Sequence, residues 1–334
     1  MISFNALVPE SYGIDLDIEK CSRPTPSSPF IHIIRWSKIW GILPISYDKS
    51  QRKWCTSRFY VFWIICFIGF NVPCFFECIY VSISEDGLTL YVMVLIVGVM
   101  SISAVSTHAL SLIQYNQWAY FLNHWILFEQ RFPTLTIGVY SKKMPIPLFI
   151  GFVSCVIFYI VNILNELRFN IINEGGVGRM LSLVYVYVIY SYTLSTPILW
   201  IVMTSKVLCL CLSLVRQELD SVLLCVKGGF HCSITPIQKC ITTKDMDNLK
   251  EAILELTRLI ESFKKIMGPI MLVIMPHHII SLICFLYWLF VSVLDYTDWY
   301  FPLSFGLLSF QAIAPIFIGA VYSENVHDKV RIII

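Results

Sequence analysis

The chain has 334 residues, of which 57% are hydrophobic and only 14% are charged. Soluble domains average roughly 45–50% apolar and ~25% charged residues, so this composition excludes an ordinary soluble fold. The net charge of +2 comes without a concentrated basic stripe, which argues against a nucleic-acid partner. The surplus of apolar side chains therefore predicts a protein embedded in the lipid bilayer.

Residues 1–57 are predicted to be a segment that precedes the membrane. Met1–Pro29 carries four acidic residues and several prolines, and it has no uninterrupted apolar run. A cleavable signal peptide needs such a run, so we expect the first apolar block to direct insertion instead. The transmembrane domain is then expected to cover residues 58–334.

Six long apolar blocks follow in chain order. Each is long enough for a transmembrane helix, which needs ~20 residues to cross ~30 Å of hydrocarbon. The predicted fold class is an all-α integral membrane protein, a bundle of about six transmembrane helices. The expected spans are about 59–83, 88–113, 146–164, 181–212, 266–294 and 300–322.

The basic residues predict the orientation of these spans. Of the 24 Lys and Arg residues, 22 lie in the N-terminal segment and in the connections on its side of the membrane. Only Arg168 and Arg179 fall on the opposite side, beside acidic turns. Because Lys and Arg accumulate on the cytoplasmic side of membrane proteins, the N-terminus is expected in the cytoplasm. The chain as a whole is expected to be a multi-pass protein of the plasma membrane.

The connection between the fourth and fifth spans predicts cytoplasmic anchor helices over about 208–266. Apolar residues recur there at steps of three and four, which is the pattern of an amphipathic helix. They are Leu249, Ile253, Leu256, Ile260, Phe263 and Met267. The fourth span also keeps a helical pattern beyond the bilayer, so the two extensions are expected to pack together.

Polar and aromatic residues inside the spans are the candidate ligand contacts, because an unpaired polar group in hydrocarbon costs several kcal/mol by roughly any scale. The alternatives remain open: an interfacial aromatic belt for Tyr and Trp, and satisfied core imidazoles beside the Pro276 kink. At least one of the two adjacent histidines should face protein or water. The candidates are Asn162, Tyr187, Tyr190, His277, His278, Tyr287, Trp288 and Gln311.

No catalytic signature, cofactor site or metal site is predicted. The chain has no H-E-x-x-H, G-x-S-x-G or phosphate-binding glycine loop, so we do not expect an enzyme. The group Cys225, His231, Cys232 and Cys240 lacks the spacing of structural zinc ligands. His108 in the second span is expected to make an interhelical hydrogen bond rather than to bind metal.

Several segments resemble the arthropod gustatory receptors. The stretch Ile33–Ser46 is similar to the family's basic and apolar segment before the first span, which ends in a Gly-x-x-Pro turn. The long fourth-to-fifth connection resembles the family's cytoplasmic anchor, and Gly319–Val330 resembles its polar exit after the sixth span. The cytoplasmic N-terminus also agrees with this family.

The resemblance implies a seven-helix, ligand-gated cation channel that works as a homo- or hetero-tetramer and binds a small-molecule tastant. The ligand pocket would face the extracellular side, among the second to sixth spans. The family's seventh span lines the pore, and no counterpart of its Thr-Tyr…Gln-Phe ending precedes Ile334. The chain is therefore expected to be a fragment, a splice product or a shortened member that does not conduct alone. The alternative functions are a secondary transporter and a non-conducting partner subunit.

Overall fold

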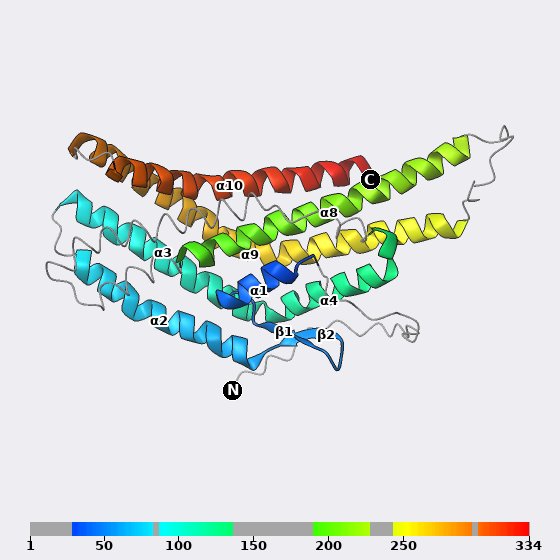
Figure 1. The fold of residues 1–334 in the computed structure, drawn as a ribbon, viewed down its shortest axis with the longest axis horizontal. Coiled ribbons are helices and arrows are strands. Elements are labelled where there is room, and N and C mark those ends of the chain that lie inside the picture. Colours follow the sequence, from blue (N-terminus) through cyan, green and yellow to red (C-terminus); the bar gives the residue numbers. More distant parts are fainter. Residues whose placement is uncertain (1–28, 83–86, 136–189, 228–242, 296–299, 334) are drawn as a thin grey trace.

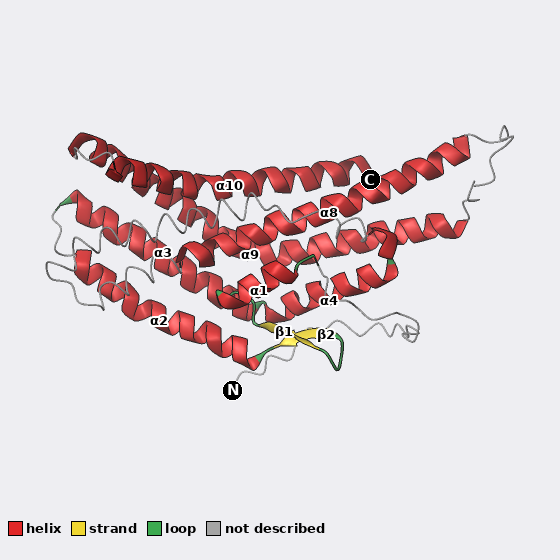
Figure 2. Ribbon diagram, in the orientation of Figure 1, coloured by secondary structure: helices red, strands yellow, loops and turns green. Residues whose placement is uncertain are grey.

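A computed structural model describes residues 29–82, 87–135, 190–227, 243–295 and 300–333. Over these ranges the chain is a bundle of long helices with one small β-hairpin (Figures 1 and 2). The helical fold class agrees with the sequence prediction, whereas the hairpin was not predicted. The elements are α1 (Ile31–Ile39), β1 (Ile45–Asp48), β2 (Lys53–Thr56), α2 (Arg58–Ser82), α3 (Leu88–Ile113), α4 (Tyr115–Arg131), α8 (Tyr190–Lys227), α9 (Thr243–Asp295) and α10 (Tyr300–Ile333).

The helices lie over the predicted apolar blocks wherever the structure describes them. Helices α2 and α3 cover the first two blocks, and α10 continues past the expected end at residue 322. The expected third span, 146–164, lies outside the described residues. Within the described residues, three helical stretches are long and apolar enough to cross a membrane: Val94–Ile113, Thr193–Val222 and Met246–Leu294.

Helix α9 is one continuous helix of 53 residues, in which the predicted anchor helix and the predicted fifth span are joined. Four residues of the predicted stripe are buried: Leu249, Leu256, Phe263 and Met267. Leu259, Ile266 and Ile270, which were not predicted, are buried beside them. Ile253 and Ile260 of the expected stripe lie at its edge and are only partly buried. The difference arises because α9 is covered by both α4 and α8 rather than by one neighbour.

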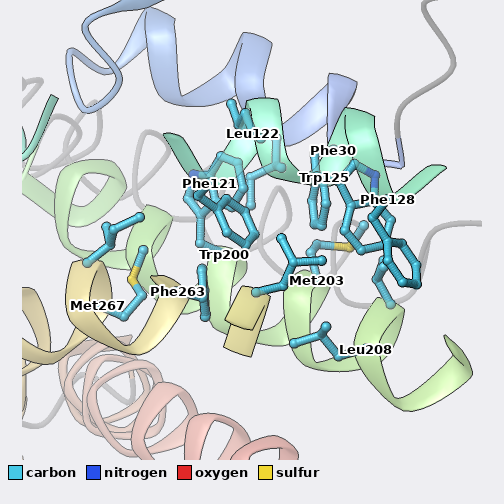
Figure 3. Close-up of a cluster of buried hydrophobic side chains, with 14 of the residues drawn as sticks. Phe30, Phe121, Leu122, Trp125, Phe128, Trp200, Met203, Leu208, Phe263 and Met267 are labelled. Carbon is cyan, nitrogen blue, oxygen red and sulfur yellow. The ribbon is translucent and has the colours of Figure 1, made fainter. Parts of the chain in front are cut away.

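A cluster of aromatic side chains joins the helices that meet around the start of α4. The Trp118 and Trp200 rings lie 4.7 Å apart between centroids, and those of Phe121 and Phe263 lie 5.4 Å apart. Phe30 stacks on Trp200 from the segment before α1. Figure 3 shows the rings of Phe30, Phe121, Trp200 and Phe263 between α4, α8 and α9. Aromatic burial of this kind dominates core energetics, so this cluster fixes the helices relative to one another.

A short chain of hydrogen bonds ties α1 to α8 inside this cluster. The Trp200 indole N–H donates to the Ser37 hydroxyl oxygen at 2.7 Å, and the Ser37 hydroxyl donates to the Ile33 carbonyl at 2.7 Å. Both side chains are fully buried. The buried indole N–H is thereby satisfied, which removes a penalty of about 1–3 kcal/mol.

The hairpin is held against α4 by the Asn123 side chain. Its carbonyl oxygen accepts from the Trp54 N–H at 2.7 Å, and its amide donates to the Trp54 carbonyl at 3.0 Å. Strands β1 and β2 pair antiparallel with Tyr47 opposite Trp54. Asn123 therefore satisfies an edge of β2 in the way that a third strand would.

Charged residues add a second connection between α4 and α9. Arg131 lies 2.5 Å from Glu251, and Glu255 contacts both His124 and Arg258. Burial lowers the pKa of His124, Glu255 opposes this effect, and Arg258 adds to it. The Arg131 and Glu251 side chains are largely exposed, so their pair contributes at most about 1 kcal/mol.

Replacing Trp200 with Ala should lower the free energy of unfolding by about 3–5 kcal/mol, because it opens a cavity and removes one of the two hydrogen-bond partners of Ser37. The melting temperature of the detergent-purified protein measures this loss. Phe62→Ala is the matched control, since the Phe62 ring is 63% exposed and should shift the melting temperature little. Equal shifts for the two variants would contradict the assignment of the core.

Replacing Asn123 with Leu should detach the hairpin from α4, because both Trp54 backbone groups lose their partner. We expect a loss of roughly 1–3 kcal/mol and faster hydrogen exchange confined to residues 45–56. Hydrogen exchange followed by mass spectrometry checks this outcome. Exchange in the hairpin that stays as slow as in the unmodified protein would show that Asn123 does not hold it.

Candidate functional site

The buried side of α9 changes from apolar to polar at His277. Ile274 belongs to the large hydrophobic cluster around the aromatic rings, and Phe285 belongs to a second cluster with α3 and α10. Between them lie His277, His278 and Ser281, which are at most 6% exposed. We refer to these three residues as the polar layer.

Helix α3 carries further buried polar residues. Ala104 of α3 lies in the same hydrophobic cluster as Phe285 of α9. Thr107 and His108 follow Ala104 by about one turn of α3, and both are fully buried. Polar side chains therefore enter the interior from α3 as well as from α9.

The polar layer has hydrogen-bonding atoms that no described residue satisfies. They are His277 Nδ1, His278 Nε2 and Ser281 Oγ. The two imidazole rings touch each other, with centroids 5.1 Å apart. A buried polar atom without a partner destabilises the fold by about 1–3 kcal/mol, and ordered water or a ligand is what usually satisfies it. The layer can therefore offer two ring nitrogens and a hydroxyl to a polar group within the bundle.

His108 has a different role, because its ring nitrogens already face protein acceptors. Nδ1 lies 2.8 Å from the Ala104 carbonyl oxygen and Nε2 lies 3.1 Å from that of Trp40. The expected interhelical hydrogen bond thus goes to the backbone that follows α1. Gly41 has a φ of +65°, and a Cβ atom there would lie 2.7 Å from the Phe67 ring. His108 therefore holds a close turn against α2 and α3 and is not a ligand contact.

Tyr287 and Trp288 lie further along α9, toward its junction with α10. Both are partly buried, and their ring centroids are 6.0 Å apart. Helical spacing of roughly 100° per residue puts Trp288 on the same face as His277 and Ser281, and Tyr287 on a neighbouring face. Trp288 thus lies on the same face of α9 as the polar layer, and Tyr287 lies beside that face.

The remaining predicted contacts are not placed by their side chains. Asn162 and Tyr187 lie outside the described residues. Tyr190 is the first residue of α8 and Gln311 lies within α10, and the structure describes only their backbone. The expectation that at least one adjacent histidine faces protein is confirmed, since both are buried. Sequence reasoning missed Ser281, although its position four residues after His277 was a signal for a shared face.

Replacing Ser281 with Ala should leave the melting temperature unchanged or raise it, because the change removes a buried hydroxyl that has no partner. Ser37→Ala is the matched comparison, since Ser37 is equally buried but bonds to Trp200 and Ile33. We expect Ser37→Ala to lower the melting temperature. Parallel losses in the two variants would show that Ser281 is satisfied in the folded protein.

The sequence matches a known family over nearly its whole length. Residues 33–333 match the family described as 7tm Chemosensory receptor. No curated protein matches the chain. The family match confirms, at the level of the family, the resemblance to arthropod gustatory receptors. It indicates a chemosensory receptor, and the described part of the chain has three helices that are long and apolar enough to span a membrane. This all-α chain belongs to the 7tm chemosensory receptor family.

Proposed function

We propose that the chain is a gustatory-type receptor subunit that binds a small-molecule tastant in the polar layer of its helical bundle. Bound ligand gates a cation channel formed by an oligomer of such subunits. The observation that carries this proposal is the set of buried atoms on His277, His278 and Ser281 that have no hydrogen-bond partner in the described part of the chain. In a bundle of a chemosensory family, they are the groups that a polar ligand would satisfy.

The chemistry of the layer favours an amphipathic ligand. Imidazole nitrogens and a hydroxyl suit alcohol, amine or amide groups, whereas Phe285 and Trp288 offer apolar contact beside them. Five further residues complete the proposed contact set from the sequence prediction. They are Asn162, Tyr187, Tyr190, Tyr287 and Gln311.

Helix α9 offers a route from the ligand to the rest of the receptor. It carries the polar layer in its C-terminal half and the contacts with α4 and α8 in its N-terminal half. A ligand shifts such a helix only if it binds one arrangement more tightly than the other. The distribution of Lys and Arg supports a plasma-membrane receptor whose N-terminus, together with the α4 end of α9, lies in the cytoplasm.

Binding of small amphipathic compounds to the purified chain tests the proposed function. Sugars, alkaloids and amino-acid derivatives are added to the protein in phosphatidylcholine nanodiscs, and the melting temperature is recorded. At least one compound should raise it saturably. Ser281→Ala should weaken that compound's affinity by about tenfold, the equivalent of one lost hydrogen bond, even though the unliganded variant is at least as stable.

Ser292→Ala is the control for this experiment. Ser292 is buried on the same helix, but its hydroxyl already donates to the Leu289 carbonyl at 2.9 Å. Its removal should leave ligand affinity unchanged. Equal losses for Ser281 and Ser292, or no compound that binds, would reject the proposed site. Solute uptake driven by an ion gradient in vesicles would instead support a transporter.

A further inference from the structure

The structure places α1 and the hairpin beside the first turns of α2. The Trp63 indole N–H donates to the Ile39 carbonyl oxygen at 3.1 Å. The Lys38 ammonium lies 4.9 Å from the Tyr60 ring centroid and 5.2 Å from that of Trp54. Burial lowers the pKa of Lys38, so this residue belongs to the packing rather than to the exposed charge. The N-terminal elements thus lie beside the start of α2 (Figure 1).

Exposed apolar side chains in this region indicate which part of it faces the bilayer. Ile39, Phe59 and Phe62 are 58%, 67% and 63% exposed, and the Ile39 carbonyl accepts the Trp63 hydrogen bond. In a membrane protein, large exposed apolar residues at the start of a span face acyl chains, and Trp lies at the headgroup level. The hairpin follows directly on the side away from the span.

The exposed charge of the same region is almost entirely positive. Asp48 is the only acidic residue between positions 29 and 66. Its carboxylate accepts from the N–H and hydroxyl of Ser50, so it stabilises the turn of the hairpin. Five basic residues are exposed and form no salt bridge within the described residues. One of them, Lys53, lies opposite Asp48 in the strand register. We name them the basic collar: Arg35, Lys49, Arg52, Lys53 and Arg58.

Arg52 is held in a backbone conformation that does not favour arginine. Its φ is +51°, and it is the only residue other than glycine with a positive φ in the described part of the chain. Asn or Gly would adopt this conformation at lower cost. The Arg52 side chain is exposed, so burial does not offset this cost, and its charge is the property that distinguishes it from Asn or Gly.

We propose that the basic collar binds the headgroups of anionic phospholipids in the leaflet that surrounds the start of α2. Phosphate and carboxylate groups of these lipids complement five exposed cations, while their acyl chains contact Phe59 and Phe62. Clusters of Lys and Arg next to a span bind anionic lipid in this way, and the attraction falls off within a Debye length. The collar adds a lipid partner that is independent of the ligand in the polar layer.

Titration with water-soluble short-chain lipids tests this proposal. The complete chain in neutral detergent is titrated with dioctanoyl phosphatidylserine or dioctanoyl phosphatidylcholine, and the melting temperature is followed. Phosphatidylserine should raise it at lower concentration. The variant Lys49→Gln, Arg52→Asn, Lys53→Gln should need at least about tenfold more phosphatidylserine, since each cation near a surface contributes several-fold in affinity. High salt should abolish the preference.

The matched control removes three exposed cations that lie at least eight residues from any expected span. The variant Lys250→Gln, Arg258→Gln, Arg331→Gln changes the net charge equally, and its affinity for phosphatidylserine should stay within about twofold of the unmodified protein. The single variant Arg52→Asn should be at least as stable without lipid and yet bind phosphatidylserine more weakly. An equal loss in the control, no preference over phosphatidylcholine, or the same shift with inorganic phosphate alone would overturn the proposal.

Discussion

The continuous buried face of α9 is the constraint on which the other helices depend. A helix of 53 residues rises about 80 Å, whereas the hydrocarbon layer is about 30 Å thick, so α9 must pack well beyond the membrane. The same face contacts α4 and α8 at one end and α3 and α10 at the other. One stripe of buried residues along α9 therefore positions the helices inside the membrane relative to those that extend beyond it.

The polar layer interrupts this stripe where apolar residues would give the more stable fold. Two clusters with well-packed apolar side chains lie on either side of His277 and Ser281. Ser37 and Ser281 show the contrast, because the first hydroxyl has two partners and the second has none among the described residues. Unsatisfied groups inside a stable scaffold are typical of sites that trade stability for binding.

Helix α1 and the β-hairpin are held in a defined position beside the start of α2, although both are short. Asn123 pairs with the backbone of Trp54, and Trp200 anchors Ser37 of α1 from the interior. One side of these elements thus packs against α4 and α8. The five residues of the basic collar lie outside this packing and are exposed. A lipid contact on one surface and a ligand site in the interior can coexist because different side chains serve each.

The amino-acid sequence by itself determined the helices whose apolar runs have clear ends, such as Leu88–Ile113, and the amphipathic stripe that contains Leu256 and Phe263. Helix α4 was not predicted from the sequence. Its apolar residues, Trp118 and Trp125 among them, are interspersed with polar ones, and the segment is less apolar than a span. Only the tertiary structure decided that the His108 ring lies within hydrogen-bond distance of backbone carbonyls, while His277 Nδ1 and His278 Nε2 have no partner among the described residues. Local periodicity fixes which face a residue occupies, but its hydrogen-bond partner comes from whichever distant backbone that face meets.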